Sequence, residues 1–309
     1  MGTIPQDRDR TFVPFSASLQ ARINAGERTP GQIEDYRKFL AEVEAKFMRH
    51  SVITSNSYCQ WFAQGAIPRE HLRHFIAQFS VFSNLFLIAQ LKKTINSGTL
   101  QSMRASKEIL ANEIGVIFHK AGRGNGKSDD AMSEEEKDLS GDPALVSTEG
   151  TVDGGTFRFR ASHFEWLLRI GEQLGLGFAD MGKRRHGTSA TLFFCDELER
   201  IYGSEDLSVA EGASFAVENW AAAGFWKQLV QGLKAFKQEQ LPSLSLSFFT
   251  WHDKVEDQHA AHTHDELEEV FFEDWFDREK FLAGGQEMLA GVAAFWIGLD
   301  ADRKQSAVV

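Results

Sequence analysis

Three residues in the last third of the chain have the types and spacing of a metal site. His252, Glu256 and His259 stand at positions i, i+4 and i+7. At about 100° per residue, an α-helix places all three on one face. The Glu256-x-x-His259 pair has the spacing of helices that hold carboxylate-bridged di-iron centres. The alternative is a solvated, histidine-rich helix end, and ligands from elsewhere in the chain must decide between the two.

Two isolated glutamates in apolar segments are candidates for those further ligands. Glu218 lies in the small and apolar run 213–225, and Glu113 lies in the apolar run 109–118. A buried carboxylate is costly unless it is paired or bound to a metal. Helical bundles also build metal sites from side chains on several facing helices. We therefore predict both glutamates as ligands, the alternative being partly exposed carboxylates at helix edges.

One more histidine is needed to complete such a site. His163 begins an amphipathic segment that continues through Phe164 and Leu167. His119 follows Glu113 by six residues, which on a straight helix places the two about 120° apart. We predict His163 as the ligand. His119 stays open as its replacement, because a helix bulge would turn it toward the face of Glu113.

The elements that must position these residues are predicted to be helices. Thr29-Pro30 and Ser57 are typical helix starts, and Pro68 opens a long segment whose apolar residues follow the 3.6-residue period. Helices are expected at residues 30–50, 57–65, 68–93, 100–118, 162–177, 188–203, 207–238, 244–271 and 277–298. The fold class predicted is all-α, a single helical bundle.

One long segment interrupts this helical pattern. Residues 120–155 hold seven glycines, many acidic residues and few large apolar ones, a composition typical of a loop. The predicted organisation is an N-terminal extension over residues 1–28, a bundle over 29–299 with the inserted loop 120–155, and a C-terminal tail over 300–309. The position of the loop between Glu113 and His163 suggests a lid.

Composition excludes several classes of partner. A formal charge of −11 disfavours nucleic acid and anionic membranes, which both require a basic surface. The sequence contains no run of eighteen apolar residues, so no membrane span is predicted. The two cysteines, Cys59 and Cys195, form no close-spaced motif, so a reducing, cytoplasmic location is expected.

The order of these segments resembles a known family. The short segment Ser57–Gly65, then Ile67-Pro68-Arg69-Glu70 and Phe75-x-x-Gln78-Phe79, is similar to the start of the TenA/PQQ-synthase/heme-oxygenase-like bundle. The order Glu113, His163, Glu218 and His252-x3-Glu256-x2-His259 resembles the heme-oxygenase-like di-iron oxidases and oxygenases, a group of iron-containing redox enzymes. The resemblance covers roughly residues 40–298. This chain departs from the pattern in its long insertion, and in Glu256 where aspartate is commoner.

The resemblance implies a ligand set and a reaction class. A pair of iron ions, Fe(II) or Fe(III), would be held by Glu113, His163, Glu218, His252, Glu256 and His259, with Glu113 and Glu218 also acting in catalysis. The implied reaction is O2-dependent oxidation of a small amine- or amino-acid-derived metabolite by N-oxygenation, oxidative C–C cleavage or desaturation. The implied partners are that substrate and O2. The resemblance is also compatible with an external electron donor and with a homodimer. Aromatic residues near the ligands in sequence would keep the site dry, and the alternative is that they only pack the core. These residues are Trp166, Trp220, Phe225, Trp226, Phe248, Phe249 and Trp251.

Two alternatives from other functional classes remain open. The first is a metal-free member of the same bundle, either a cofactorless PQQ-synthase-type oxidase or a thiaminase-type hydrolase that uses Cys195. The second is a bundle that binds a partner without catalysis. A metal-free member would not require the glutamate and histidine constellation, so metal content distinguishes it from the di-iron oxidase. A bundle that only binds a partner would show no O2 consumption with Fe(II).

Overall fold

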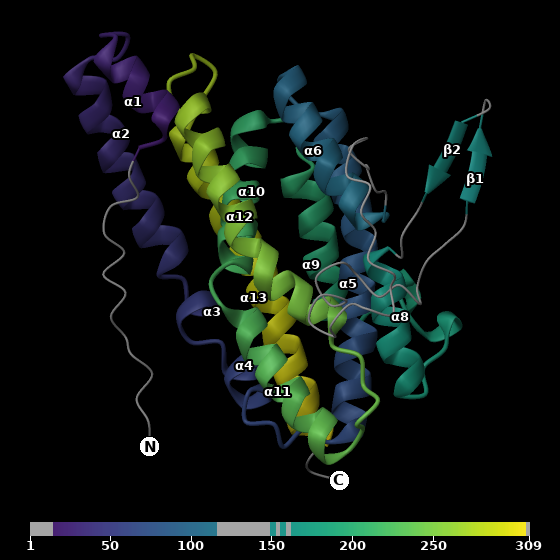
Figure 1. The fold of residues 1–309 in the computed structure, drawn as a ribbon. Helices are drawn as coiled ribbons and strands as arrows, with labels where there is room; N and C mark the ends of the chain where they lie inside the picture. The colour runs from purple at the N-terminus through teal and green to yellow at the C-terminus, as the bar shows by residue number, and fades with distance from the viewer. Residues whose placement is uncertain (1–14, 116–148, 153–154, 159–161, 307–309) are drawn as a thin grey trace.

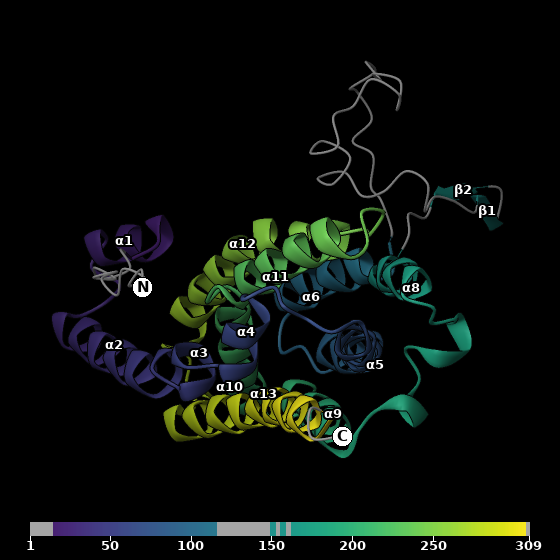
Figure 2. The ribbon, with the colours of Figure 1, turned by 90° about the horizontal axis from the view of Figure 1, so that it is seen from below.

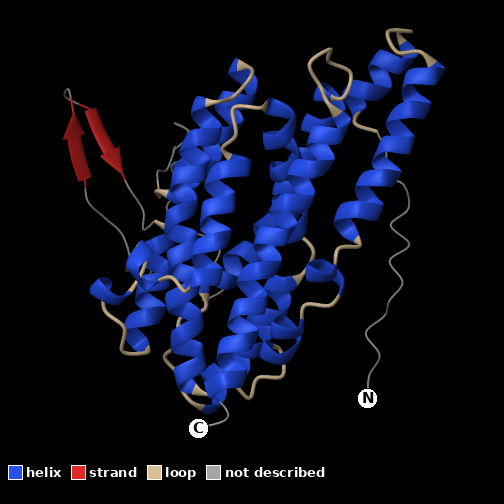
Figure 3. Cartoon of the chain, turned by 180° about the vertical axis from the view of Figure 1, so that it is seen from behind, coloured by secondary structure: helices blue, strands red, loops and turns tan. Residues whose placement is uncertain are grey.

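The structure is a computed structural model that describes residues 15–115, 149–152, 155–158 and 162–306, without the side chains of residues 112, 149–152, 155–158, 255–262 and 306. Nearly all of the described chain is helical (Figures 1 and 3). The long helices share a common direction and pack around a core rich in phenylalanine. The all-α class predicted from the sequence is therefore confirmed at the level of class.

The N-terminal part contains more helix than the sequence predicts. Residues 1–28 were expected to be irregular, but α1 spans Ala17–Asn24. Its buried Leu19 anchors the helix to the core. The predicted start at Thr29 is confirmed, because Thr29 and Gln32 form a capping box at the start of α2, Pro30–Val43. A π-helical turn η1 (Glu44–Met48) and the short helices α3 (Ser51–Thr54) and α4 (Ser57–Phe62) follow.

Helix α5 is the central element of the half of the bundle that contains the predicted ligands. It spans Arg69–Ile95 and is followed by α6, Leu100–Glu113. Figure 2 shows α5 nearly end-on, with α6, α8, α9 and α13 arranged around it. Phe75 and Phe79 lie on its buried face, as the 3.6-residue period predicts.

The inserted segment contains two strands where a loop was predicted. Strand β1 (Glu149–Val152) pairs antiparallel with β2 (Gly155–Arg158), with Val152 opposite Gly155. Figure 1 shows this hairpin projecting away from the bundle. Residues 120–148, which make up most of the predicted loop, lie outside the described part of the chain, so the lid remains a hypothesis.

Chain direction changes several times between α8 and α11. Helix α8 spans His163–Gln173, and the 3-10 turns η4 (Phe178–Asp180) and η5 (Arg184–His186) lead to α9, Ser189–Glu197. The π-helical turn η6 covers Leu198–Tyr202. The prediction of a single helix over 207–238 is wrong, because α10 (Leu207–Ala221) and α11 (Phe225–Glu239) are separate helices. Gly224 separates them with a φ of 101°, a backbone conformation that glycine adopts without steric cost.

The last two helices are long. Helix α12 spans Ser247–Val270 and α13 spans Arg278–Ser306. Residues 300–306, predicted as a tail, therefore continue α13. Helix α10 packs closely on α13 because it presents Gly212 to the Phe281 carbonyl, which would lie 1.9 Å from an added Cβ.

Two of the described helices, α5 and α13, are long and apolar enough to cross a membrane by length and composition. In their most apolar stretches, 50% and 56% of the residues are buried inside the bundle. Buried core helices of this length meet the same criterion, so the two helices are weak evidence for a span.

Candidate metal centre

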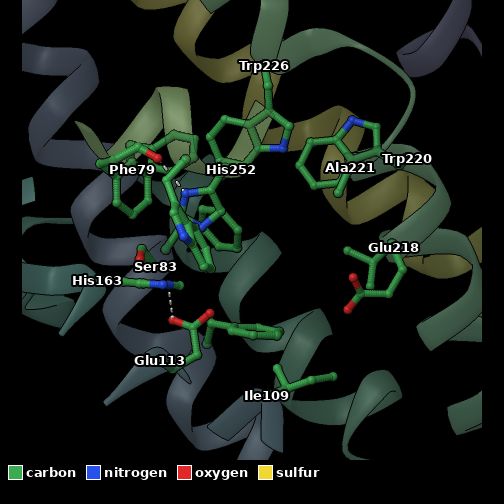
Figure 4. Close-up of a pocket in the computed structure, with 15 residues that line it drawn as sticks. Phe79, Ser83, Ile109, Glu113, His163, Glu218, Trp220, Ala221, Trp226 and His252 are labelled. Carbon is green, nitrogen blue, oxygen red and sulfur yellow. Dashed lines mark hydrogen bonds and ion pairs between the residues drawn. The ribbon is translucent and has the colours of Figure 1, made fainter. Parts of the chain in front are cut away.

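Four of the six predicted ligands line one cavity. Glu113 ends α6, His163 begins α8, Glu218 lies near the end of α10, and His252 lies in the second turn of α12. Figure 4 shows Glu218 across the cavity from Glu113 and His163, with both carboxylates directed inward. The cavity has a volume of about 90 Å³. Four segments that are far apart in sequence thus bring two carboxylates and two imidazoles to the same space.

Glu113 and His163 are in direct contact. The Nδ1 atom of His163 lies 2.9 Å from Oε2 of Glu113, and the two side chains are 7% and 14% exposed. The start of α8 is fixed by Glu165, whose carboxylate accepts a hydrogen bond from the Ser162 N–H at 2.6 Å. His163 is thereby held at the first position of the helix, beside Glu113. His119, the alternative to His163, lies outside the described residues.

His252 is buried and held in one tautomer. Its Nδ1 atom lies 2.7 Å from the Phe248 carbonyl oxygen. Since a carbonyl only accepts, Nδ1 carries the proton and Nε2 carries the lone pair, the form in which imidazole binds a metal. The Trp226 ring stacks on the imidazole with centroids 4.6 Å apart and planes 22° apart. The imidazole rings of His252 and His163 are 4.7 Å apart between centroids.

Glu218 is a buried carboxylate, 9% exposed, as its apolar surroundings in the sequence predicted. It lies on α10, which packs against both α12 and α13. Burial raises the pKa of the nearby Tyr202 phenol, and the negative charge of Glu218 raises it further. Glu218 is therefore close enough for its charge to act on a second buried side chain.

Glu256 and His259 lie in α12, but their side chains are outside the described residues. The backbone fixes their helical register. Counted from His252, Glu256 is at i+4, His259 at i+7 and Thr263 at i+11. These positions fall on one face of the helix. The side chains at both ends of this face are buried, and Asn219 donates a hydrogen bond to the Thr263 hydroxyl at 3.0 Å. The helix face that carries the predicted triplet is therefore buried at His252 and at Thr263, its two ends.

Among the side chains that the structure describes, no group of three His, Cys, Asp or Glu residues could hold one metal ion. Glu256 and His259 are not among those side chains. The four described residues nevertheless have suitable donors, since carboxylate oxygen and imidazole nitrogen are typical ligands of non-heme iron. Their chemistry fits an iron site.

The cavity wall includes residues that the sequence did not assign to the site. Helix α5 contributes Phe79, Phe82, Ser83 and Phe86. The 3.6-residue apolar period identified this face as buried, but it could not distinguish a core from a cavity wall. Of the aromatic residues expected near the ligands, four line the cavity, namely Trp220, Trp226, Phe248 and Trp251.

Cys195, the nucleophile of the hydrolase alternative, is poorly suited to that role. It is buried in α9 and is absent from the described lining of the cavity. Burial, together with the charge of Asp196, raises the pKa of its thiol to about 12. Because the thiolate is the reactive form, this cysteine is unreactive near neutral pH.

Comparisons with known proteins leave the family unassigned. No family model and no curated protein matches this sequence.

Proposed function

We propose that this protein is a non-heme di-iron oxidase or oxygenase with a heme-oxygenase-like bundle. It would use O2 to oxidise a small metabolite, in the cytoplasm. The observation that supports the proposal most is the meeting of Glu113, His163, Glu218 and His252 in one aromatic-walled cavity. These residues come from four helices, as in bundles that hold two metal ions between facing helices.

The proposed ligands are Glu113, His163, Glu218, His252, Glu256 and His259. When bound, the iron pair would activate O2, and O2 would supply the oxidising equivalents. The protein's own contribution begins with the state of its imidazoles. Nδ1 of His252 donates a hydrogen bond to the Phe248 carbonyl, and Nδ1 of His163 contacts the Glu113 carboxylate. In each ring this leaves Nε2 as the atom that would bind a metal.

The aromatic wall has a second role, which is to exclude water. Trp226 covers one face of His252, and the Trp251 ring lies 5.0 Å from that of His163 between centroids. A dry, low-dielectric site strengthens the interactions of the two carboxylates with bound cations. It also protects a strong oxidant from side reactions with solvent.

Oxygen uptake tests the proposal. Protein loaded anaerobically with Fe(II) is mixed with a limiting pulse of O2, and the rate of O2 loss is recorded. The proposal predicts rapid uptake by the wild type, compared with Fe(II) in buffer. It also predicts loss of the protein-dependent uptake in His252→Ala.

His74→Ala is the matched control, because His74 bonds Asp302 at 2.9 Å and does not line the described cavity. This variant should retain the wild-type uptake rate. Equal uptake by wild type, His252→Ala and buffered Fe(II) would contradict the proposal.

A further inference from the structure

We propose that Ser83 holds the polar group of the substrate by a hydrogen bond, and that the substrate is a small molecule with a flat, apolar body and a hydrogen-bonding group at one end. This inference rests on the proposed function and narrows the substrate class. Its support comes from one unpaired hydroxyl group and from the aromatic rings around it.

Ser83 lies on the face of α5 that forms part of the cavity wall. Phe79, Ser83 and Phe86 stand at i, i+4 and i+7, and all three line the cavity. The serine therefore has a phenyl ring about one turn before it and another about one turn after it. Figure 4 shows Ser83 on the same side of the cavity as His163, with Glu218 on the other side. A ligand that packs against these phenyl rings thus meets the hydroxyl on the His163 side of the site.

The hydroxyl of Ser83 is buried without a partner. Ser83 is 8% exposed, and within the described part of the chain its side chain takes part in no hydrogen bond. Other buried hydroxyls of α5 are satisfied by their own helix. Ser80 donates to the Ala77 carbonyl at 2.7 Å, and Thr94 donates to the Gln90 carbonyl at 2.9 Å. Because a helical serine can bond locally in this way and buried polar groups normally have a partner, the Ser83 hydroxyl is available to a ligand.

The rings of the described wall suit a flat, apolar body. The indoles of Trp220, Trp226 and Trp251 line the cavity together with phenyl rings such as that of Phe82. Rings of this kind bind flat ligands through burial of apolar surface and stacking. In such pockets a few polar groups fix the orientation of the ligand. A ligand that displaces water from Ser83 without replacing its hydrogen bond would bind more weakly.

Fluorine NMR titration of the full-length, metal-free protein tests the inference with two neutral probes. 4-Fluorophenol and fluorobenzene differ by one hydroxyl group, and both are uncharged near neutral pH. We expect the wild type to bind 4-fluorophenol about three- to tenfold more tightly, the effect of one neutral hydrogen bond. Equal affinities for the two probes, or failure of 4-fluorophenol to bind, would overturn the inference.

Variants at two serines assign the effect to one hydroxyl. Ser83→Ala should remove the preference for 4-fluorophenol and leave the affinity for fluorobenzene nearly unchanged, and Ser83→Thr, which keeps a hydroxyl, should retain the preference. Ser80→Ala is the matched control, because the Ser80 hydroxyl is already bonded to Ala77 and to the Gly182 N–H. This control should keep the wild-type preference. An unchanged preference in Ser83→Ala would overturn the inference.

A second pair of variants tests whether the probes bind in this cavity. Ala221→Phe fills part of the wall and should weaken both probes, whereas Ala290→Phe, at an exposed position of α13, should weaken neither. Equal binding by these two variants would place the probes elsewhere and overturn the inference. The titrations require neither iron nor O2, so their outcome is separate from that of the O2-uptake experiment.

Discussion

The Nδ1 atom of His163 lies 2.9 Å from Oε2 of Glu113, which joins the first residue of α8 to the last residue of α6. The inserted segment separates these two residues in sequence, yet the fold brings them together at the cavity. This contact is the strongest support for His163 as the partner of Glu113. It also provides a local interaction whose strength can be measured.

The Glu113–His163 contact should contribute to stability in the metal-free protein. Both side chains are largely buried, and removing one partner leaves a buried polar group unsatisfied, at a cost of about 1–3 kcal/mol. Urea unfolding of Glu113→Ala, His163→Ala and the double variant should give a coupling energy of about 0.5–3 kcal/mol. The exposed Arg184–Asp196 pair is a control and should couple more weakly. Additive effects of Glu113→Ala and His163→Ala would argue against the contact.

Trp226 should support both the fold and the orientation of His252. Its buried ring stacks on the imidazole, and truncation of a buried tryptophan to alanine typically costs about 3–5 kcal/mol. We expect Trp226→Ala to lose stability of that order in urea unfolding, and Trp226→Phe to lose less because it keeps an aromatic face. If Trp226→Ala were as stable as the wild type, the ring would not pack as described.

The thiol of Cys195 should be inert in the folded protein. Its folded pKa of about 12 lies above the ordinary value of 9.0, so the neutral thiol is favoured by folding, and this contribution to stability is lost as the pH rises from 9 toward 12. At pH 8, an aromatic disulfide reagent should label neither Cys195 nor the buried Cys59. Both should react in denaturant. Rapid labelling of Cys195 in the folded protein would favour the hydrolase alternative.

The close packing of α10 against α13 should not tolerate a side chain at Gly212. An added Cβ would lie 1.9 Å from the Phe281 carbonyl oxygen, and overpacking of this kind typically costs about 1–3 kcal/mol. Gly212→Ala should therefore unfold at a lower urea concentration than the wild type. Gly31→Ala, where the nearest atom is 4.0 Å away, should be neutral or stabilising. Equal midpoints for the two variants would contradict the described packing.

Sequence patterns predicted the helical class, and four of the residues proposed from the sequence as ligands line one cavity in the structure. Glu113 and Glu218 were identifiable because each acid stands in an apolar helical segment, where burial is costly without a partner. His252 was identifiable from its spacing to Glu256 and His259. The apolar period of α5 predicted a buried face but could not show that Phe79 and Phe82 line a cavity, because that depends on which helices pack against them.

The remaining differences have local causes. The break at Gly224 was missed because its neighbours Ala222 and Ala223 are strong helix formers. The hairpin of β1 and β2 was missed in a glycine-rich segment, although the dipeptide Asp153-Gly154 is typical of hairpin turns. Helix α1 was missed because its polar sequence contributes few side chains to the core. In the structure, Ser16 caps this helix by accepting a hydrogen bond from the Leu19 N–H.

The number of iron ions bound at equilibrium tests the central claim most directly. Protein is dialysed anaerobically against Fe(II), and iron is counted per chain in the wild type, in Glu218→Ala and in Glu199→Ala, whose glutamate pairs with Lys92 at the surface. The account predicts about two iron ions per chain in the wild type and in Glu199→Ala, and clearly fewer in Glu218→Ala. Wild-type protein that retains no iron, or Glu218→Ala that retains as much as the wild type, would contradict it.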